Sequence, residues 1–298
     1  NAGTALTEGS KNVAIGNEAL AANTTADRNT SVGANSLSAN TVGARNVAVG
    51  YQALLTNVNG SRSVAVGHNA LSVQNYSGAT DGYNTAIGHE AGAAVTTGQF
   101  NTFIGGLAGD ANTTAGSNTG LGYAALGANT TGANNTATGV NAMVTNTTGT
   151  QNVAVGEQAL YSNTTASWNT AVGYDALRAN TTGANNTAVG NNALNANTTG
   201  QENTAVGSAA LDANTSGSYN TSIGLGSLGV NTTGQRNTAV GTYALDANTT
   251  GDYNNAVGMY ALTAATTPDW NDAFGYSAMS SLTTGAANVA FGGAAMSF

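Results

Sequence analysis

Asn186-Thr187-Ala188-Val189-Gly190 is the clearest copy of a five-residue motif that recurs along the 298-residue chain. We call its last residue the corner glycine. It occurs 17 times at intervals of 17 residues, and only the interval from Gly67 to Gly88 is longer, by four residues. A short fixed period indicates a solenoid or fibre, in which each repeat is one coil that stacks on its neighbours. We therefore predict an all-β parallel β-solenoid or β-roll of about 17 coils with a 17-residue repeat.

The composition supports a repeat structure and excludes several other classes of protein. Only 7% of the residues are charged, 41 are glycine, and the net charge is -8. Such low charge can accompany disorder, but the strict phase of Val, Ala and Leu argues against it. The negative charge makes nucleic acid an unfavourable partner. No apolar run approaches about 18 residues, so we predict no membrane insertion.

The repeat itself suggests how each coil is built. Asn-Thr-Ala-Val is short, favours β structure and is bounded by glycine, so we predict a strand. Asn-Thr-Thr-Gly reads as a turn, and Ala-Leu as a second short strand or a tight corner. No stretch of ten or more residues with helical periodicity lacks a glycine, so no helix is expected.

We expect the two faces of the strand to differ. The residue before the corner glycine, the Val column, is apolar in 16 of 17 copies. This predicts that the Val column points into the coil, opposite the Leu column that includes Leu20, Leu37, Leu54 and Leu71. Alternation along the strand then places the Ala column, such as Ala188, on the outer face, where another subunit could approach closely. With so few large apolar residues per coil, we expect partner chains around a common axis.

Asparagine recurs at two places in the repeat. The first residue of the motif, the strand Asn column, includes Asn12 and Asn29, with Ser63 as the exception, and should form an amide ladder along the solenoid. The Asn-Thr-Thr segments, by contrast, match the acceptor pattern for N-glycosylation. They begin at Asn23, Asn112, Asn129, Asn146, Asn163, Asn180, Asn197, Asn231 and Asn248.

Two local departures from the repeat stand out. The four-residue insertion lies within residues 74–83, a segment rich in turn-forming residues, and predicts a bulging surface loop. Shortly after it, Gly92 and Gly109 replace leucines while Phe103 replaces an alanine. We predict that the Phe103 ring fills the space left by the two leucines.

Asn12-Val13-Ala14-Ile15-Gly16 closely resembles the repeat of the YadA-like heads of trimeric autotransporter adhesins. The fuller pattern from Asn169 to Gly183 is also similar to repeats of phage tail-fibre proteins. The resemblance implies a trimeric β-roll or β-solenoid, with chains intertwined or packed together. The 17-residue coil is longer than the YadA-like unit. Because residues 1–298 begin and end inside a repeat, we interpret them as a single repeat array excerpted from a longer fibre.

One column collects long side chains and is the candidate recognition stripe. It lies two residues before the Thr of the motif and holds five of the six basic residues and both tryptophans. These side chains could cover an edge or a seam between subunits, or they could form a surface for a cell-surface glycan or receptor. The stripe consists of Lys11, Arg28, Arg45, Arg62, Tyr83, Phe100, Trp168, Tyr219, Arg236, Tyr253 and Trp270.

Other chemistry is poorly supported by the sequence. His68 and His89 occupy equivalent places in consecutive repeats and could form a two-histidine metal site, but strand alternation would turn Glu90 away. We therefore predict no metal site and no cofactor. The chain shows no Ser-His-Asp set, cysteine nucleophile or phosphate loop, so we predict that it is not an enzyme.

These observations favour the structural shaft of an extracellular or virion fibre, either a phage tail fibre or a surface adhesin, which presents a receptor-binding region. The localisation expected from this reading is extracellular or on the virion surface, with copies of the same chain as partners. An ice-binding solenoid is one alternative, because Thr recurs in register. Adjacent Thr181 and Thr182 argue against it, since they would point to opposite faces of a strand. A self-assembling extracellular filament subunit is the other alternative.

Overall fold

The computed structural model describes residues 1–297. It divides into two units, Asn1–Gln151 and Asn152–Phe298, and each is a stack of coils. Both units contain strands and turns, and residues 1–297 include no helix, which confirms the predicted all-β class. Consistent with this, none of the described residues forms a helix long and apolar enough to cross a membrane.

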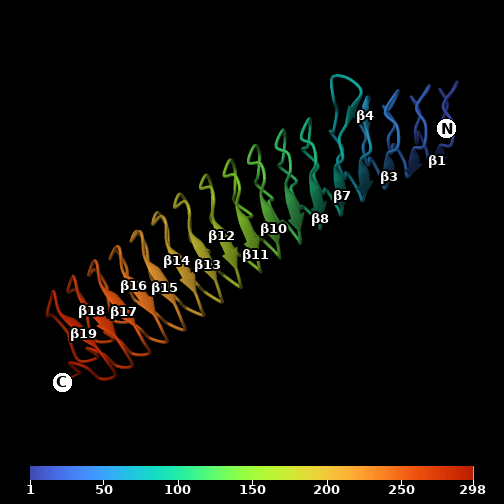
Figure 1. Ribbon diagram of the computed structural model, residues 1–298. Coiled ribbons are helices and arrows are strands. Elements are labelled where there is room, and N and C mark those ends of the chain that lie inside the picture. The colour runs from blue at the N-terminus through green and yellow to red at the C-terminus, as the bar shows by residue number, and fades with distance from the viewer. Residues whose placement is uncertain (298) are drawn as a thin grey trace. The chain divides into compact units, whose positions relative to one another are not determined.

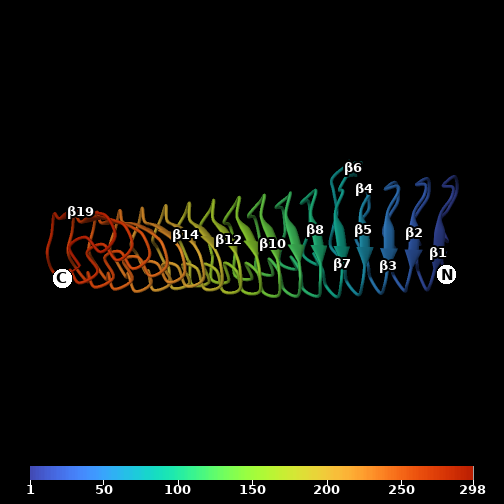
Figure 2. The same ribbon diagram turned by 60° about the horizontal axis from the view of Figure 1, so that its bottom comes forward.

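Each motif copy forms one short strand (Figures 1 and 2). In the first unit these are β1 (Val13–Ile15), β2 (Thr30–Val32), β3 (Val47–Val49), β5 (Val64–Val66), β7 (Thr85–Ile87), β8 (Thr102–Ile104), β9 (Thr119–Leu121) and β10 (Thr136–Thr138). The strands β4 (Gly60–Ser61) and β6 (Thr80–Asp81) form a separate pair. The second unit holds β11 (Val153–Val155), β12 (Thr170–Val172), β13 (Thr187–Val189), β14 (Thr204–Val206), β15 (Thr221–Ile223), β16 (Thr238–Val240), β17 (Asn255–Val257), β18 (Asp272–Phe274) and β19 (Val289–Phe291).

Within each unit, the strands of successive coils pair in parallel and in register. In β13 and β14, for example, Thr187, Ala188 and Val189 lie opposite the residues 17 positions later. Every side chain of the motif is therefore repeated directly above its equivalent in the previous coil. This confirms the predicted parallel β-solenoid with a 17-residue repeat.

The turns also bond to neighbouring coils, although they contain no strand. The Leu194 N–H donates to the carbonyl of Ala210 at 2.9 Å, and the Thr198 N–H donates to the carbonyl of Thr215 at 2.9 Å. Leu194 adopts a left-handed conformation with a φ of 53°, so Ala-Leu forms a tight corner rather than a second strand. Because the hydrogen bonds continue around the coil, a strand of only three residues is sufficient for stacking.

The predicted orientation of the strand faces is wrong. Ala188 and the other alanines of the Ala column from Ala48 to Ala273 are fully buried inside the coil, whereas the Val column faces outward, with Ile15 59% exposed. The Leu column, including Leu194, points inward as expected. The interior is narrow, because the corner alanine Ala193 and the leucine already fill it opposite the strand. In most coils the space there suits only a small side chain, so alternation turns the larger valine outward.

Two buried asparagine columns line the rest of the interior. In the strand Asn column, Asn186 Oδ1 accepts from the Asn203 backbone N–H at 3.0 Å, while its amide nitrogen donates to the Gly200 carbonyl at 2.9 Å. The predicted ladder therefore exists; in most coils it joins side chain to backbone, and in some coils, such as Asn254 to Asn271 at 3.2 Å, the side-chain amides bond to one another as well. A second ladder between side-chain amides runs along the first residues of the Asn-Thr-Thr segments and their equivalents, which we call the turn Asn column; there Asn214 donates to Asn197 Oδ1 at 2.9 Å.

The burial of the Asn-Thr-Thr asparagines argues against N-glycosylation. The asparagines of the Asn-Thr-Thr segments are fully buried, and Asn197 also donates from its amide nitrogen to the Gly200 carbonyl at 3.0 Å. A glycan would require this nitrogen to leave the interior and face solvent. The pattern that resembles an acceptor site is thus an internal polar ladder.

The insertion between β5 and β7 leaves the coil register intact. Val64 still pairs with Thr85, and the extra residues form a loop that projects beside β4 (Figure 1). The tip of the loop is exposed, as predicted, but Gln74 and Tyr76 turn inward. The Tyr76 hydroxyl donates to the Gly98 carbonyl at 3.0 Å, and burial raises the pKa of Tyr76 to about 12. The loop therefore also contributes to the core.

The predicted volume exchange around Phe103 is confirmed. Phe103 is fully buried on β8, and a Cβ atom added at Gly109 would lie 2.3 Å from its ring. An added Cβ at Gly92 would lie 3.1 Å from the same ring. The aromatic ring thus occupies the space that leucine fills in other coils.

A serine pair replaces two buried alanines in each of two coils, Ser31 with Ser36 and Ser222 with Ser227. Ser222 on β15 and Ser227 in the following corner have their hydroxyl oxygens 2.6 Å apart, and Ser222 also donates to the Ser227 carbonyl at 2.7 Å. Because hydroxyl groups in this interior need partners, the two substitutions are coupled.

We expect Ser222→Ala alone to lower the free energy of unfolding by about 1 kcal/mol, because Ser227 loses one hydrogen-bond partner in a buried site. The double variant Ser222→Ala/Ser227→Ala restores the alanines of the other coils and should be within about 0.5 kcal/mol of the parent. Urea denaturation of both single variants and the double variant measures the coupling. Additive losses would show that the two hydroxyl groups act independently.

Candidate functional site

The recognition stripe follows one turn of each coil and projects into solvent. Its residues lie just before the strand Asn column and adopt left-handed backbone conformations, such as Trp168 with a φ of 59°. Trp270 is 59% exposed, and Phe100 and Tyr219 are also exposed. Within each unit, these side chains therefore lie in one surface column, as the sequence spacing predicts.

In the second unit, four stripe residues form a continuous stack. The Arg236 guanidinium carbon lies 5.3 Å from the ring centroids of both Tyr219 and Tyr253. Arg236 also donates to the Tyr253 hydroxyl at 2.8 Å. Tyr253 and Trp270 stack with their centroids 4.1 Å apart and their planes within 4°. The alternation of cation and aromatic ring avoids the repulsion that stacked cations would suffer.

The first unit contains a shorter stack of the same kind. Arg62 lies 5.6 Å from the centroid of the Tyr83 ring, which stacks on Phe100 at 5.8 Å. Arg62 also forms an ion pair with Asp81 of β6. The insertion thus supplies both the carboxylate and the first ring of this stack.

The other stripe residues have different surroundings. Near the start of the first unit, Lys11 and Arg28 lie close to Asp27. Hydrogen bonds from the Ser10 N–H and hydroxyl lower the pKa of Asp27, and the charges of Arg28 and Lys11 act in the same direction. In the coils after Phe100, Ser117 and Asn134 replace the long side chains. The structure therefore brings together two clusters of the stripe, Arg62 to Phe100 and Tyr219 to Trp270.

A second exposed column of side chains lies immediately after the corner glycine. From the sequence, only His68 and His89 of this column were considered. Tyr51 stacks on His68 with a centroid distance of 5.3 Å, and His68 stacks on His89 at 5.1 Å. The expectation that Glu90 points elsewhere is wrong, because it lies in a turn rather than a strand. Its Oε1 atom is 3.9 Å from His89 Nε2.

An aromatic pair in the second unit was not predicted from the sequence. Tyr243 and Tyr260 stack with their centroids 5.9 Å apart, and the Tyr276 ring lies edge-on to Tyr260 at 6.4 Å. Tyr243 and Tyr260 occupy the same place in consecutive repeats, two residues after the corner glycine. That shared position is the signal that could have revealed the pair.

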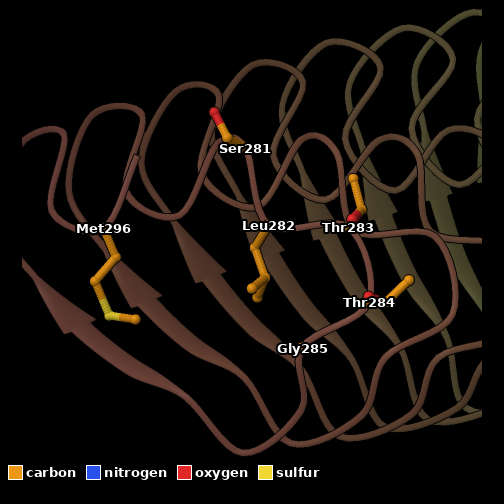
Figure 3. Close-up of a pocket in the computed structure, with 6 residues that line it drawn as sticks. All are labelled: Ser281, Leu282, Thr283, Thr284, Gly285 and Met296. Carbon is orange, nitrogen blue, oxygen red and sulfur yellow. The ribbon is translucent and has the colours of Figure 1, made fainter. Parts of the chain in front are cut away.

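A hollow of about 420 Å³ lies in the last coils of the second unit, between the turn at Ser281–Gly285 and Met296 (Figure 3). Figure 3 shows the Leu282 and Met296 side chains along its wall. Leu282 belongs to the turn Asn column, and Met296 to the Leu column. No lining residue is titratable, so we locate the candidate site on the exposed stripes instead.

No family model and no curated protein matches the chain. The class is therefore defined by the fold: each unit is a parallel β-solenoid built from 17-residue repeats, with exposed ladders of stacked side chains.

Proposed function

We propose that this chain is a structural shaft of an extracellular or virion fibre, of the kind resembled by YadA-like heads and phage tail fibres. The observation that carries the proposal is the succession of ladders from coil to coil. Backbone bonds, two asparagine columns and the Leu column all repeat at the same spacing. A coil with bonded neighbours on both sides resists bending and proteolysis, which is what a shaft requires.

The proposed assembly is a homotrimer that packs through the outward strand face. The Thr and Val columns of β12 to β16 present hydroxyl, methyl and isopropyl groups without any charged side chain. Several members of the Val column are exposed in the single chain, including Phe291 at 70%. Burial of this apolar column between copies would also compensate for an interior whose apolar part is little more than alanine and one leucine per coil.

The stacked part of the stripe is the proposed recognition surface of the shaft. Tyr253 and Trp270 offer flat ring faces, and Arg236 offers donors beside them. A sugar presents C–H groups on one face and hydroxyl groups around its edge, so this arrangement suits a cell-surface glycan.

Sedimentation equilibrium of the purified chain tests the shaft assembly. We expect a mass of three chains, and we expect Val189→Lys/Val206→Lys to yield single chains because charges would be buried at the interface. The control Asn191→Lys/Ser208→Lys places the same charges just after the corner glycines of the same coils and should remain trimeric. A parent that sediments as a single chain at all concentrations would rule out the trimer. Growth of the mass without limit would instead favour the filament subunit.

An ice-binding role is a second candidate, supported by the outward Thr column. Thr187, Thr204 and Thr221 lie in register and are partly exposed on the same face as the Val column. The sequence argument against this role concerned Thr181 and Thr182, which lie in a turn, so it does not apply to the strand. Thermal hysteresis of the purified chain tests this alternative, and its absence would remove it.

A further inference from the structure

We infer that His68, His89 and Glu90 form a binding site for a divalent transition metal ion, with zinc the best match. One potential ligand atom from each side chain lies within 4.8 Å of the other two. Both histidines are exposed, so solvent and ions can reach their rings. All three residues belong to the first unit, and the site does not depend on the proposed assembly.

The fold brings the three side chains together in spite of the insertion. Because the extra residues loop out, β5 and β7 remain in register. His68 and His89, which each directly follow a corner glycine, therefore lie in neighbouring coils. The imidazole rings lie 5.1 Å apart with their planes within 7°. The Glu90 N–H donates to the His68 carbonyl at 2.8 Å, which fixes the glutamate backbone beside both histidines.

The distances are compatible with coordination after small side-chain rotations. Zn–N bonds of about 2.0–2.1 Å in a tetrahedral shell place donor atoms roughly 3.4 Å apart. The separations, all within 4.8 Å, therefore have to shorten by at most roughly 1.4 Å. The side chains of His89 and Glu90 are 60% and 37% exposed, so their rotation displaces no packed core. Tyr51 stacks against His68 and limits its ring to a narrow range of positions.

The donor set and the local charge select the kind of ion. Two imidazoles and one carboxylate suit zinc, copper and nickel better than calcium or magnesium, which favour oxygen ligands. Glu90 supplies negative charge, and Asp110 lies close enough to feel it. Burial raises the pKa of Asp110, and the Glu90 charge adds to that rise. Three protein ligands leave a fourth tetrahedral position open to water or to a group from another molecule.

Titration of the full chain, without a histidine tag, with Zn²⁺ against a colorimetric chelator tests this site. We expect one ion per chain. Because loss of even an outer partner weakens metal binding by about 10- to 100-fold, His89→Gln and His68→Gln should each weaken it by about 100-fold or more. Glu90→Gln should weaken it by about 10-fold or more. Glu18→Gln is the matched control, because Glu18 occupies the same place in an earlier coil and lacks histidine neighbours.

Co²⁺ provides a spectroscopic readout of ligand identity. Its visible absorption should show nitrogen ligation in the parent and lose it in His89→Gln. The inference is overturned if the parent binds no Zn²⁺ at millimolar concentration, or if the histidine variants bind as tightly as the parent. It is also overturned if Glu18→Gln weakens binding as much as Glu90→Gln, since that would indicate general attraction to an acidic chain. Circular dichroism of each variant checks that the coils remain folded.

Discussion

Phe103→Ala should lower the free energy of unfolding by about 3–5 kcal/mol, the usual cost of removing a buried aromatic ring. The loss is expected to be large because the surrounding positions are glycines. Gly92 and Gly109 have no side chains that could move into the cavity, and Gly120 faces the same ring, with an added Cβ 3.1 Å away. Urea denaturation measures the effect.

Compensating substitutions at the same site should restore stability, which would not happen if Phe103→Ala acted only by a general disruption of the fold. Gly109→Leu alone should be destabilising, because its Cβ would lie 2.3 Å from the Phe103 ring. Combined with Phe103→Ala and Gly92→Leu, it restores the alanine and leucines of the other coils and should recover most of the lost stability. The control Phe100→Ala removes an exposed ring and should cost less than about 1 kcal/mol. Failure of the triple variant to exceed Phe103→Ala in stability would contradict the volume exchange.

Gly105→Ala should strongly destabilise the chain. Gly105 has a φ of 139°, and an added Cβ would lie 2.3 Å from the carbonyl oxygen of Gly122 in the next coil. The backbone strain alone costs about 1–3 kcal/mol. The clash adds to this cost because it pushes apart two coils that pack closely through their corner glycines. We expect a total loss of about 3 kcal/mol or more.

The adjacent residue provides the control for this prediction. Gly106 has no such conformation, and an added Cβ would meet only the Tyr123 ring at 3.7 Å. Gly106→Ala should therefore change the free energy of unfolding by less than about 0.5 kcal/mol. Thermal and urea denaturation of the two variants compare them directly. Equal stability of the two would show that the corner does not require glycine.

Much of the fold could be predicted because the period and the special residues carry geometric information. The 17-residue spacing predicted the parallel coils, and the paired changes at Phe103, Gly92 and Gly109 predicted a contact across coils. The orientation of the strand could not be obtained from hydrophobicity, because alternation states only that Ala and Val face opposite ways. The range of side-chain sizes found in each column was the better signal of which column faces inward. The Val column accommodates Thr138 and Phe291, whereas the Ala column is restricted to small residues, apart from the compensated Phe103.

The candidate site was predicted less completely. The cationic and aromatic stripe was visible as a column, but the order of the stack from Tyr219 to Trp270 depends on coil spacing and side-chain rotation. The side chain of Glu90 was predicted to point away from the histidines because strand alternation was assumed there. Glu90 instead lies in a left-handed turn, with a φ of 56°. The Asn-Thr-Thr pattern alone could not show whether these segments carry glycans, because the pattern does not reveal that the asparagines are buried.

Thiol reactivity at adjacent positions of β13 tests the central claim, that each coil encloses the Ala column and exposes the Val column. The chain has no cysteine, so single introduced thiols are read without background. In the native protein, Val189→Cys should react with maleimide or form a disulfide with another copy, whereas Ala188→Cys should do neither until the chain unfolds. Rapid labelling of Ala188→Cys together with protection of Val189→Cys from both reactions would contradict the account.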